Sequence, residues 1–302
     1  MSEYEISRVL DIKARLGEAP LWCVAKQSLV WLDIHKCTIN RFNPSSGDNQ
    51  EWSLPSMPGC FMLREGDGAI IAAQDGIYDF DFVTGASKRI CTAPFDSASY
   101  RFNDGKPDRQ GRLWAGSVYL HFDLHDPKTD LGSFYRYDGN TLELGISPIS
   151  VANGCAFSPD GRTIYHAETH LNLIYAWDYD PAMGTASGKR LFAEVPKELG
   201  VPDGATVDTE GGYWVALALG DTAGGIARYT PDGKMDVYFT TPVLIPTMVA
   251  FGGPDMSTLY FTSMGELDAR YCTRPLGEMA GDIFAVETKF HGIPEVYHRS
   301  PK

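Results

Sequence analysis

Basic residues are scarce in this chain of 302 residues. It has 26 lysines and arginines against 39 aspartates and glutamates, which gives a net charge of −13. A protein that binds nucleic acid needs a concentrated basic surface to neutralise phosphates. The composition therefore argues against a nucleic-acid partner, and the negative charge is typical of a soluble protein.

Long apolar runs are also missing. No stretch approaches the roughly 20 apolar residues of a transmembrane helix. The first residues, Met1–Glu5, show no basic segment followed by an apolar one, as a secretory signal would. We therefore expect a cytoplasmic protein with no membrane partner, while the sequence carries no signal for its oligomeric state.

Three sequence patterns of common protein classes are absent. The six cysteines are scattered without a Cys-x-x-Cys pair, so a zinc–thiolate site has little support and we expect reduced thiols. No Gly-x-Ser-x-Gly motif occurs, which weakens a serine hydrolase. No long apolar face repeats every 3.6 residues, which excludes a helical solenoid.

Glycine, proline and aromatic residues are plentiful instead, and they favour an all-β protein with many tight turns. A turn pattern recurs along the chain. Asn103, Asn153 and Asp203 lie fifty residues apart, and each precedes the glycine of a turn by eight residues. An aromatic-containing strand follows each turn, as in Leu113–Gly116 and Tyr213–Ala216. This period is the first indication of the architecture.

Weaker copies of the pattern begin near Glu18, Cys60 and Thr247, so the chain has six units of about fifty residues. Units of three or four strands at this period are typical of propeller blades. The sequence thus predicts an all-β, six-bladed β-propeller with four-stranded antiparallel blades, forming one domain over residues 1–302. An eight-stranded sandwich would not explain the fixed period.

A propeller must close its ring, and we expect the N-terminal strand to complete the last blade. Glu5–Leu10 alternates like a strand but has no blade of its own. We expect it to lie beside a strand near Glu295–His298. The longest irregular segments, His121–Asp130 and Gly265–Ala280, are expected to be loops over one rim.

Polar residues stand at one fixed point of the repeat, which we take to be the start of each innermost strand. The residues at this point are Glu18, Cys60, Asn103, Asn153, Asp203 and Thr247. Ring closure would gather them at the mouth of the central channel. The carboxylates of Glu18 and Asp203 and the amide oxygen of Asn153 are ligands suited to a hard or borderline divalent cation.

A simpler interpretation treats two of these positions as turns. Asn153-Gly154 and Asp203-Gly204 are dipeptides of tight hairpins. However, Gly154–Phe157 reaches the next turn almost at once, so the dipeptide opens a short strand. Because it does so in phase across blades, we favour a site.

Four motifs resemble the SMP-30/gluconolactonase/regucalcin family, in the family's order and over essentially the whole chain. They are Leu16–Trp22, Arg101–Lys106, Asn153-Gly154 before Ser158–Gly161, and Pro202–Gly204 before Tyr213–Ala216. The resemblance implies a six-bladed propeller with one divalent metal ion in its channel. It also implies an enzyme that hydrolyses lactones of sugar acids.

The resemblance makes Glu18, Asn153 and Asp203 the metal ligands, with Asp203 also the catalytic base. It makes Arg101 and Asn103 substrate-binding residues. This chain has His121 where animal members carry a glutamate, and we include His121 among the substrate-binding residues because of its position. Whether Asp203 or the metal supplies the effective base stays open. So do the metal (Ca, Zn, Mg, Mn or Fe(II)) and the sugar.

The main rival hypothesis is a calcium-binding propeller without catalysis, similar to a regucalcin-like regulator. The Arg101/Asn103 pair argues against it, because a purely structural cation site needs neither. Among the remaining polar residues, Asp104 and Asp108 are expected to fix their loop by hydrogen bonds to the backbone. Glu168 and Thr169 either line the pocket or cap a strand. Packing is the expected role of Cys60.

Overall fold

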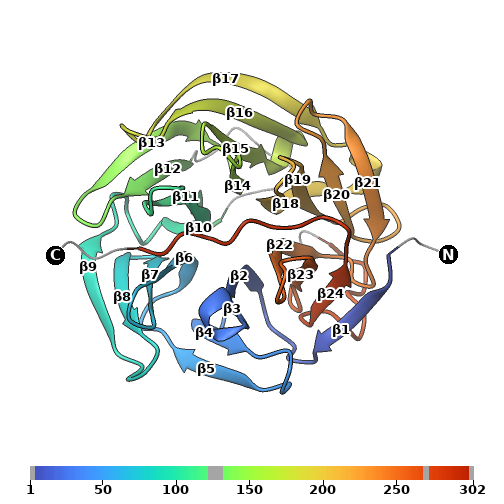
Figure 1. Ribbon diagram of the computed structural model, residues 1–302, viewed down its shortest axis with the longest axis horizontal. Helices are drawn as coiled ribbons and strands as arrows, with labels where there is room; N and C mark the ends of the chain where they lie inside the picture. Colours follow the sequence, from blue (N-terminus) through green and yellow to red (C-terminus); the bar gives the residue numbers. More distant parts are fainter. Residues whose placement is uncertain (1–3, 122–131, 268–271, 299–302) are drawn as a thin grey trace.

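The protein is a ring of six antiparallel sheets around a central channel (Figure 1). The computed structural model describes residues 4–121, 132–267 and 272–298. Each sheet has four strands, which confirms the predicted six-bladed propeller. No helix in the described ranges is long and apolar enough to cross a membrane. The six cysteines all fall within these ranges and are free thiols.

Each blade runs outward from an innermost strand at the channel. Blade one consists of β2 (Gly17–Cys23), β3 (Ser28–Asp33), β4 (Thr38–Phe42) and β5 (Asn49–Ser53). Blade two consists of β6 (Pro58–Arg64), β7 (Gly68–Ala73), β8 (Gly76–Asp81) and β9 (Ser87–Thr92). Blade three consists of β10 (Tyr100–Pro107), β11 (Leu113–Tyr119), β12 (Gly132–Tyr137) and β13 (Leu142–Ile149). Blade four consists of β14 (Ala152–Phe157), β15 (Thr163–Glu168), β16 (Leu173–Asp180) and β17 (Thr185–Glu194). Blade five consists of β18 (Val201–Val207), β19 (Tyr213–Ala218), β20 (Gly225–Tyr229) and β21 (Met235–Thr240). Blade six consists of β22 (Pro246–Gly252), β23 (Thr258–Ser263), β24 (Ile283–Glu287) and β1 (Ile6–Leu10).

Large aromatic side chains on the second strands fill the space between blades. Trp114 on β11 is fully buried and packs edge-on against Phe157 and Tyr179 of the next blade. Trp214 on β19 makes the same kind of contact with Phe251 of the sixth blade. An aromatic side chain buries a large area, so these contacts hold neighbouring blades in a fixed relation. That relation positions residues from different blades at the channel.

The N-terminal strand β1 completes the sixth blade, as expected, but its neighbouring strand is not the expected one. Strand β1 pairs directly with β24, with Ile6 opposite Val286. Glu295–His298 is not the neighbouring strand: it crosses the channel, and the backbone of His298 bonds Leu63 of the second blade (2.7 Å). Pro294 explains the difference, because a proline cannot donate to a strand ladder and interrupts pairing at this point.

All six innermost strands have a register irregularity near their first residues. It falls at Glu18/Leu21, Pro58/Cys60, Phe102/Gly105, Asn153/Ala156, Pro202/Ala205 and Pro246/Val249. A bulge bends its strand and changes the direction of the side chains beside it. The polar residues at the fixed point of the repeat therefore lie at, or next to, the position where each strand bends.

The rim loops expected from the sequence are described only in part. Residues 122–131 and 268–271, within the predicted loops His121–Asp130 and Gly265–Ala280, lie outside the described residues. Three short 3-10 helices occur among the described residues: η1 (Val24–Lys26), η2 (Thr169–Leu171) and η3 (Lys197–Leu199). Thr169, the first residue of η2, accepts a hydrogen bond from the side chain of Asn153 at the start of β14 (2.9 Å).

Candidate active site

Two carboxylates from different blades come together at the channel. Glu18 lies on β2 and Asp203 on β18, and both side chains are partly buried. Burial raises the pKa of Glu18 to about 8, and the nearby charge of Asp104 adds to the shift. Burial also raises the pKa of Asp203 well above its ordinary value, and the charge of Glu18 is the next cause. The two groups thus repel each other in a poorly solvated place.

Arg101 is the cation nearest to this pair. It lies on β10, is 8% exposed, and donates through Nη1 to its neighbour's carbonyl, Phe102 O (2.8 Å). Burial lowers its pKa to about 10, while the charges of Glu18 and Asp203 act to raise it. Within the described part of the chain, Arg101 forms no ion pair shorter than 4 Å with either carboxylate. Its charge therefore offsets the acidic pair only at a distance.

Asn153 is held in one orientation by bonds on both ends of its amide. It is 5% exposed on β14. Its Nδ2 donates to Thr169 Oγ1 (2.9 Å), and that hydroxyl donates to Pro202 O (3.0 Å) beside Asp203. Its Oδ1 accepts from Asn103 Nδ2 (2.8 Å). An amide oxygen has a second lone pair, so this atom can also serve a cation.

Asn103 uses its amide nitrogen entirely within the protein. Nδ2 donates to Asn153 Oδ1 and also to Ala152 O (3.0 Å). An amide nitrogen carries two hydrogens, so both are taken. Asn103 therefore offers its oxygen, an acceptor, to whatever occupies the channel. Toward a ligand, Asn103 can therefore act as an acceptor but not as a donor.

His121 lies apart from the other predicted residues. It follows β11 at the rim, is exposed, and packs edge-on against Tyr119 (ring centroids 5.8 Å apart). Tyr119 in turn contacts Tyr100 at the start of β10 (5.5 Å). Among the described residues no contact joins His121 to the five residues at the channel. Its place is on the rim above blade three.

Several other predictions for polar residues can be compared with the structure. Asp104 and Asp108 do bond backbone N–H groups, as expected, with Gly105 N at 2.7 Å and Gln110 N at 2.9 Å. The carboxylate of Glu168 accepts hydrogen bonds from the backbone N–H of Ser150 (3.0 Å) and from its hydroxyl (2.7 Å). Cys60 is fully buried in the apolar core.

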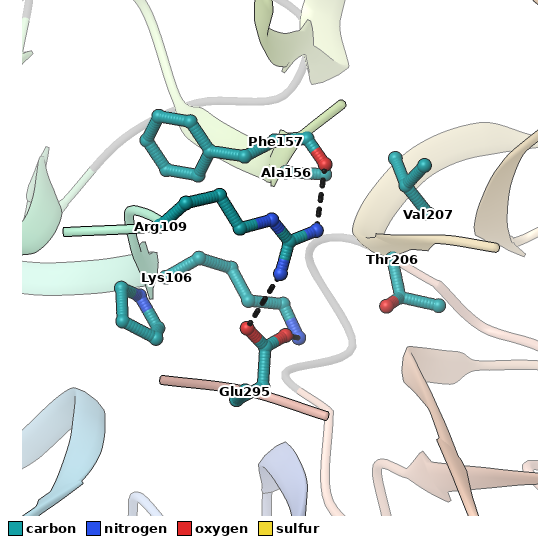
Figure 2. A pocket seen from close by; sticks show the side chains of 8 residues that line it. Lys106, Arg109, Ala156, Phe157, Thr206, Val207 and Glu295 are labelled. Carbon is teal, nitrogen blue, oxygen red and sulfur yellow. Dashed lines mark hydrogen bonds and ion pairs between the residues drawn. The ribbon is translucent and has the colours of Figure 1, made fainter. Parts of the chain in front are cut away.

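The C-terminal segment crosses the channel (Figure 1), and Glu295 of this segment faces Lys106 and Arg109 (Figure 2). Glu295 lies 3.6 Å from both Lys106 and Arg109, and the cavity beside them measures only about 10 Å³. A cavity of that size holds about one water molecule. The residues that line this cavity do not include Glu18 or Asp203.

Residues 16–265 match the sequence model described as the SMP-30/Gluconolactonase/LRE-like region. The chain belongs to this family. Among its relatives, a 6-deoxy-6-sulfogluconolactonase of Pseudomonas putida is 36% identical to this chain. The matched region covers 93% of this chain and 94% of the relative's chain. A pentonolactonase of Haloferax volcanii is 32% identical over 96% and 97% of the two chains. A solved structure of a calcium-binding protein, regucalcin, from Agrobacterium tumefaciens superposes with a TM-score of 0.89, at 27% identity and 98% coverage of each chain.

Two side chains at this candidate site make contacts that the sequence did not predict. Thr169, at the start of η2, accepts from the amide of Asn153 (2.9 Å). Thr247 was noted only for its phase, yet its hydroxyl donates to Gly17 O, next to Glu18. Their positions at strand ends were visible in the sequence. Their partners lie in a neighbouring blade or across a bulge, which no local pattern reveals.

Proposed function

We propose that this protein hydrolyses the lactone ring of a sugar acid to the free aldonic acid in carbohydrate catabolism, with one divalent metal ion as cofactor. The observation that carries the proposal is the buried pair Glu18 and Asp203, set beside the oriented amide of Asn153 and the guanidinium of Arg101. Relatives named as a sulfogluconolactonase and a pentonolactonase support the reaction class.

The residues present fit a divalent cation. Glu18 and Asp203 form an acidic pair that no described cation neutralises at contact distance, and their raised pKa values express that imbalance. No group of three His, Cys, Asp or Glu side chains gathers in the described ranges, so the third ligand would be the neutral amide of Asn153. An all-oxygen set suits Ca, Mg or Mn, and also borderline Zn or Fe(II). When bound, the metal supplies Lewis-acid polarisation of the lactone carbonyl.

The chain's own side chains have distinct roles in this reaction. A carboxylate oxygen of Asp203 accepts a proton from the attacking water, as a general base does. The water oxygen bonds to the carbonyl carbon, the bond to the ring oxygen breaks, and the ring oxygen takes up a proton to become a hydroxyl. Water and lactone together give the open hydroxy acid, so atoms balance.

Arg101 and Asn103 would orient the lactone. Arg101 offers the remaining N–H groups of a planar fork, and Asn103 offers an acceptor oxygen for a sugar hydroxyl. His121 on the rim would contact the substituents of the sugar that extend away from the reacting carbon.

A non-catalytic calcium-binding propeller is the second candidate, because the similar solved structure is described as a calcium-binding protein. The enzyme is favoured by the convergence of Arg101 and Asn103 on the acidic pair. A structural cation site gains nothing from a nearby buried cation, which weakens metal binding.

Proton release from a panel of aldonolactones tests the proposal. The protein is first stripped with a chelator and then refilled with one divalent metal at a time. We expect hydrolysis of at least one gluconic-, pentonic- or sulfosugar-type lactone, lost on stripping and restored by a metal. Metal binding without hydrolysis of any lactone would instead establish the calcium-binding propeller.

A further inference from the structure

The backbone beside each expected metal ligand is bonded by a side chain from an adjacent blade. Thr247 of blade six donates to Gly17 O, before Glu18. Thr169 of blade four donates to Pro202 O, before Asp203 (3.0 Å). Asp104 of blade three accepts from the N–H of Cys155, which lies two residues after Asn153 (2.8 Å). Of these three side chains, Asp104 alone carries a charge.

Asp104 is almost completely buried and is fully engaged. It is 5% exposed and lies at the bulge of β10. One oxygen accepts from its neighbour Gly105 N (2.7 Å) and the other accepts from Cys155 N (2.8 Å). A carboxylate with two N–H donors makes charge-assisted bonds, which are stronger than neutral ones.

These bonds fix an unusual stretch of backbone. Gly154 has a φ of +61°, and a Cβ there would lie 2.3 Å from Tyr213 Oη. Tyr213 donates to Gly154 O (2.7 Å), and Asp104 accepts from Cys155 N (2.8 Å). The peptide between Gly154 and Cys155 is therefore held at both its carbonyl and its N–H. Since a left-handed residue sets the direction of the chain around it, these bonds fix the backbone next to Asn153, whose amide Thr169 and Asn103 also hold.

We propose that Asp104 is a positioning residue for the metal site: it fixes Asn153 from the neighbouring blade and adds a negative charge beside Glu18 and Asp203. The inference rests on the proposed function, because it assigns Asp104 a role toward the same cation. Asp104 touches neither substrate nor metal, and it acts through the backbone of Gly154 and Cys155 and through its charge. Partners that orient metal ligands commonly affect metal affinity by about 10- to 100-fold.

A calorimetric titration of the metal-stripped full-length protein tests this. Asp104→Asn keeps the shape of the side chain but loses its charge and one of its two acceptors. We expect calcium and manganese each to bind this variant about 10- to 100-fold more weakly. Activity on a lactone turned over by the wild type should show a lower kcat at saturating metal, with KM changed less.

Asp108→Asn is the matched control. Asp108 lies four residues further on, is completely buried, and accepts from Gln110 N (2.9 Å), Arg112 N (2.9 Å) and Tyr179 Oη (2.5 Å) without reaching the site. We expect this variant to melt at a lower temperature but to bind metal as the wild type does. Equal weakening of metal binding in both variants would show a general structural effect and overturn the proposal.

The outcomes separate the two hypotheses. If the wild type binds a divalent metal and opens a lactone while Asp104→Asn keeps wild-type affinity and kcat, the positioning role is wrong and the proposed function stands. If the wild type binds no divalent metal, both fail. Should Asp104→Asn not fold, Asp104→Ser, which retains one small acceptor, is titrated in its place. Failure of both variants to fold would assign Asp104 to the fold and overturn the inference.

Discussion

Raising the pH should destabilise the metal-free protein through Glu18. Burial raises the pKa of this carboxyl from 4.5 to about 8, so the folded protein holds the proton more tightly than the unfolded chain. Such a group stabilises the folded state fully below 4.5, and this stabilisation is lost as the pH rises through about 8. Asp203, whose pKa is also raised, acts with the same sign.

The size of the effect follows from the shift. One pKa unit corresponds to about 1.4 kcal/mol, so a change from 4.5 to about 8 sets an upper bound of about 4.8 kcal/mol for Glu18. The side chain is partly exposed, and solvent screening reduces this to roughly 2 kcal/mol. For a chain of this length 1 kcal/mol changes the melting temperature by about 2 °C, so we expect a loss of about 4 °C between pH 5 and pH 8.

Thermal melting in the presence of a chelator, at pH values from 5 to 8, measures this loss. Glu18→Gln is the control, because it removes the titrating group and also the second cause of the raised pKa of Asp203. The difference between the two melting curves against pH isolates Glu18 from the histidines that titrate in the same range. A saturating divalent metal should abolish the decline in the wild type. Parallel curves for wild type and Glu18→Gln would refute the reasoning.

Three further substitutions test individual roles. Asp203→Asn should lower kcat by about 100-fold or more, as expected for loss of a general base, without lowering the melting temperature in chelator. Arg101→Lys should raise KM by about 10- to 100-fold in steady-state assays, because an ammonium group cannot reproduce the planar donor fork. Thr169→Val removes the acceptor for Asn153 Nδ2 and should weaken metal binding several-fold by calorimetry, whereas Ser150→Ala, which removes only a bond to Glu168, should not.

The fold could be predicted because its signal is local and repeated. Asn103, Asn153 and Asp203 recur at a fixed phase, and turns and strands depend on residues close in sequence. Closure of the ring is different, because it joins the two ends of the chain. The sequence of Glu295–His298 looks like a strand, and only the structure shows that β24 pairs with β1 while this segment crosses the channel. Pro294 argues against a strand in that segment, but it does not identify Ile283–Glu287 as the partner of the N-terminal strand.

For the candidate site, the sequence predicted positions but not contacts. The phase placed Glu18, Asn153 and Asp203 at the starts of innermost strands, and in the structure the charge of Glu18 raises the pKa of Asp203. The use of both Asn103 hydrogens inside the protein depends on the distance between two blades. The hydrogen bond from the N–H of Cys155 to the carboxylate of Asp104 depends on the same distance between blades. Such contacts arise from bulges and blade packing, which a single sequence does not encode in any short pattern.

The charges along the channel suggest why so many ionisable groups are kept there. Three carboxylates, Glu18, Asp104 and Asp203, and two cations, Arg101 and Lys106, act on one another here. Lys106 also contacts Glu295 (3.6 Å), whose charge Arg109 balances (3.6 Å). Their balance is −1 when all are ionised, and a divalent cation would change it to +1. A lactone enters neutral and develops negative charge on its carbonyl oxygen as water attacks. A site with one excess positive charge therefore stabilises the transition state more than the substrate, which is the condition for catalysis. On this argument Asp104 limits the positive charge to one unit, so that a neutral lactone can still bind and a negatively charged product is released.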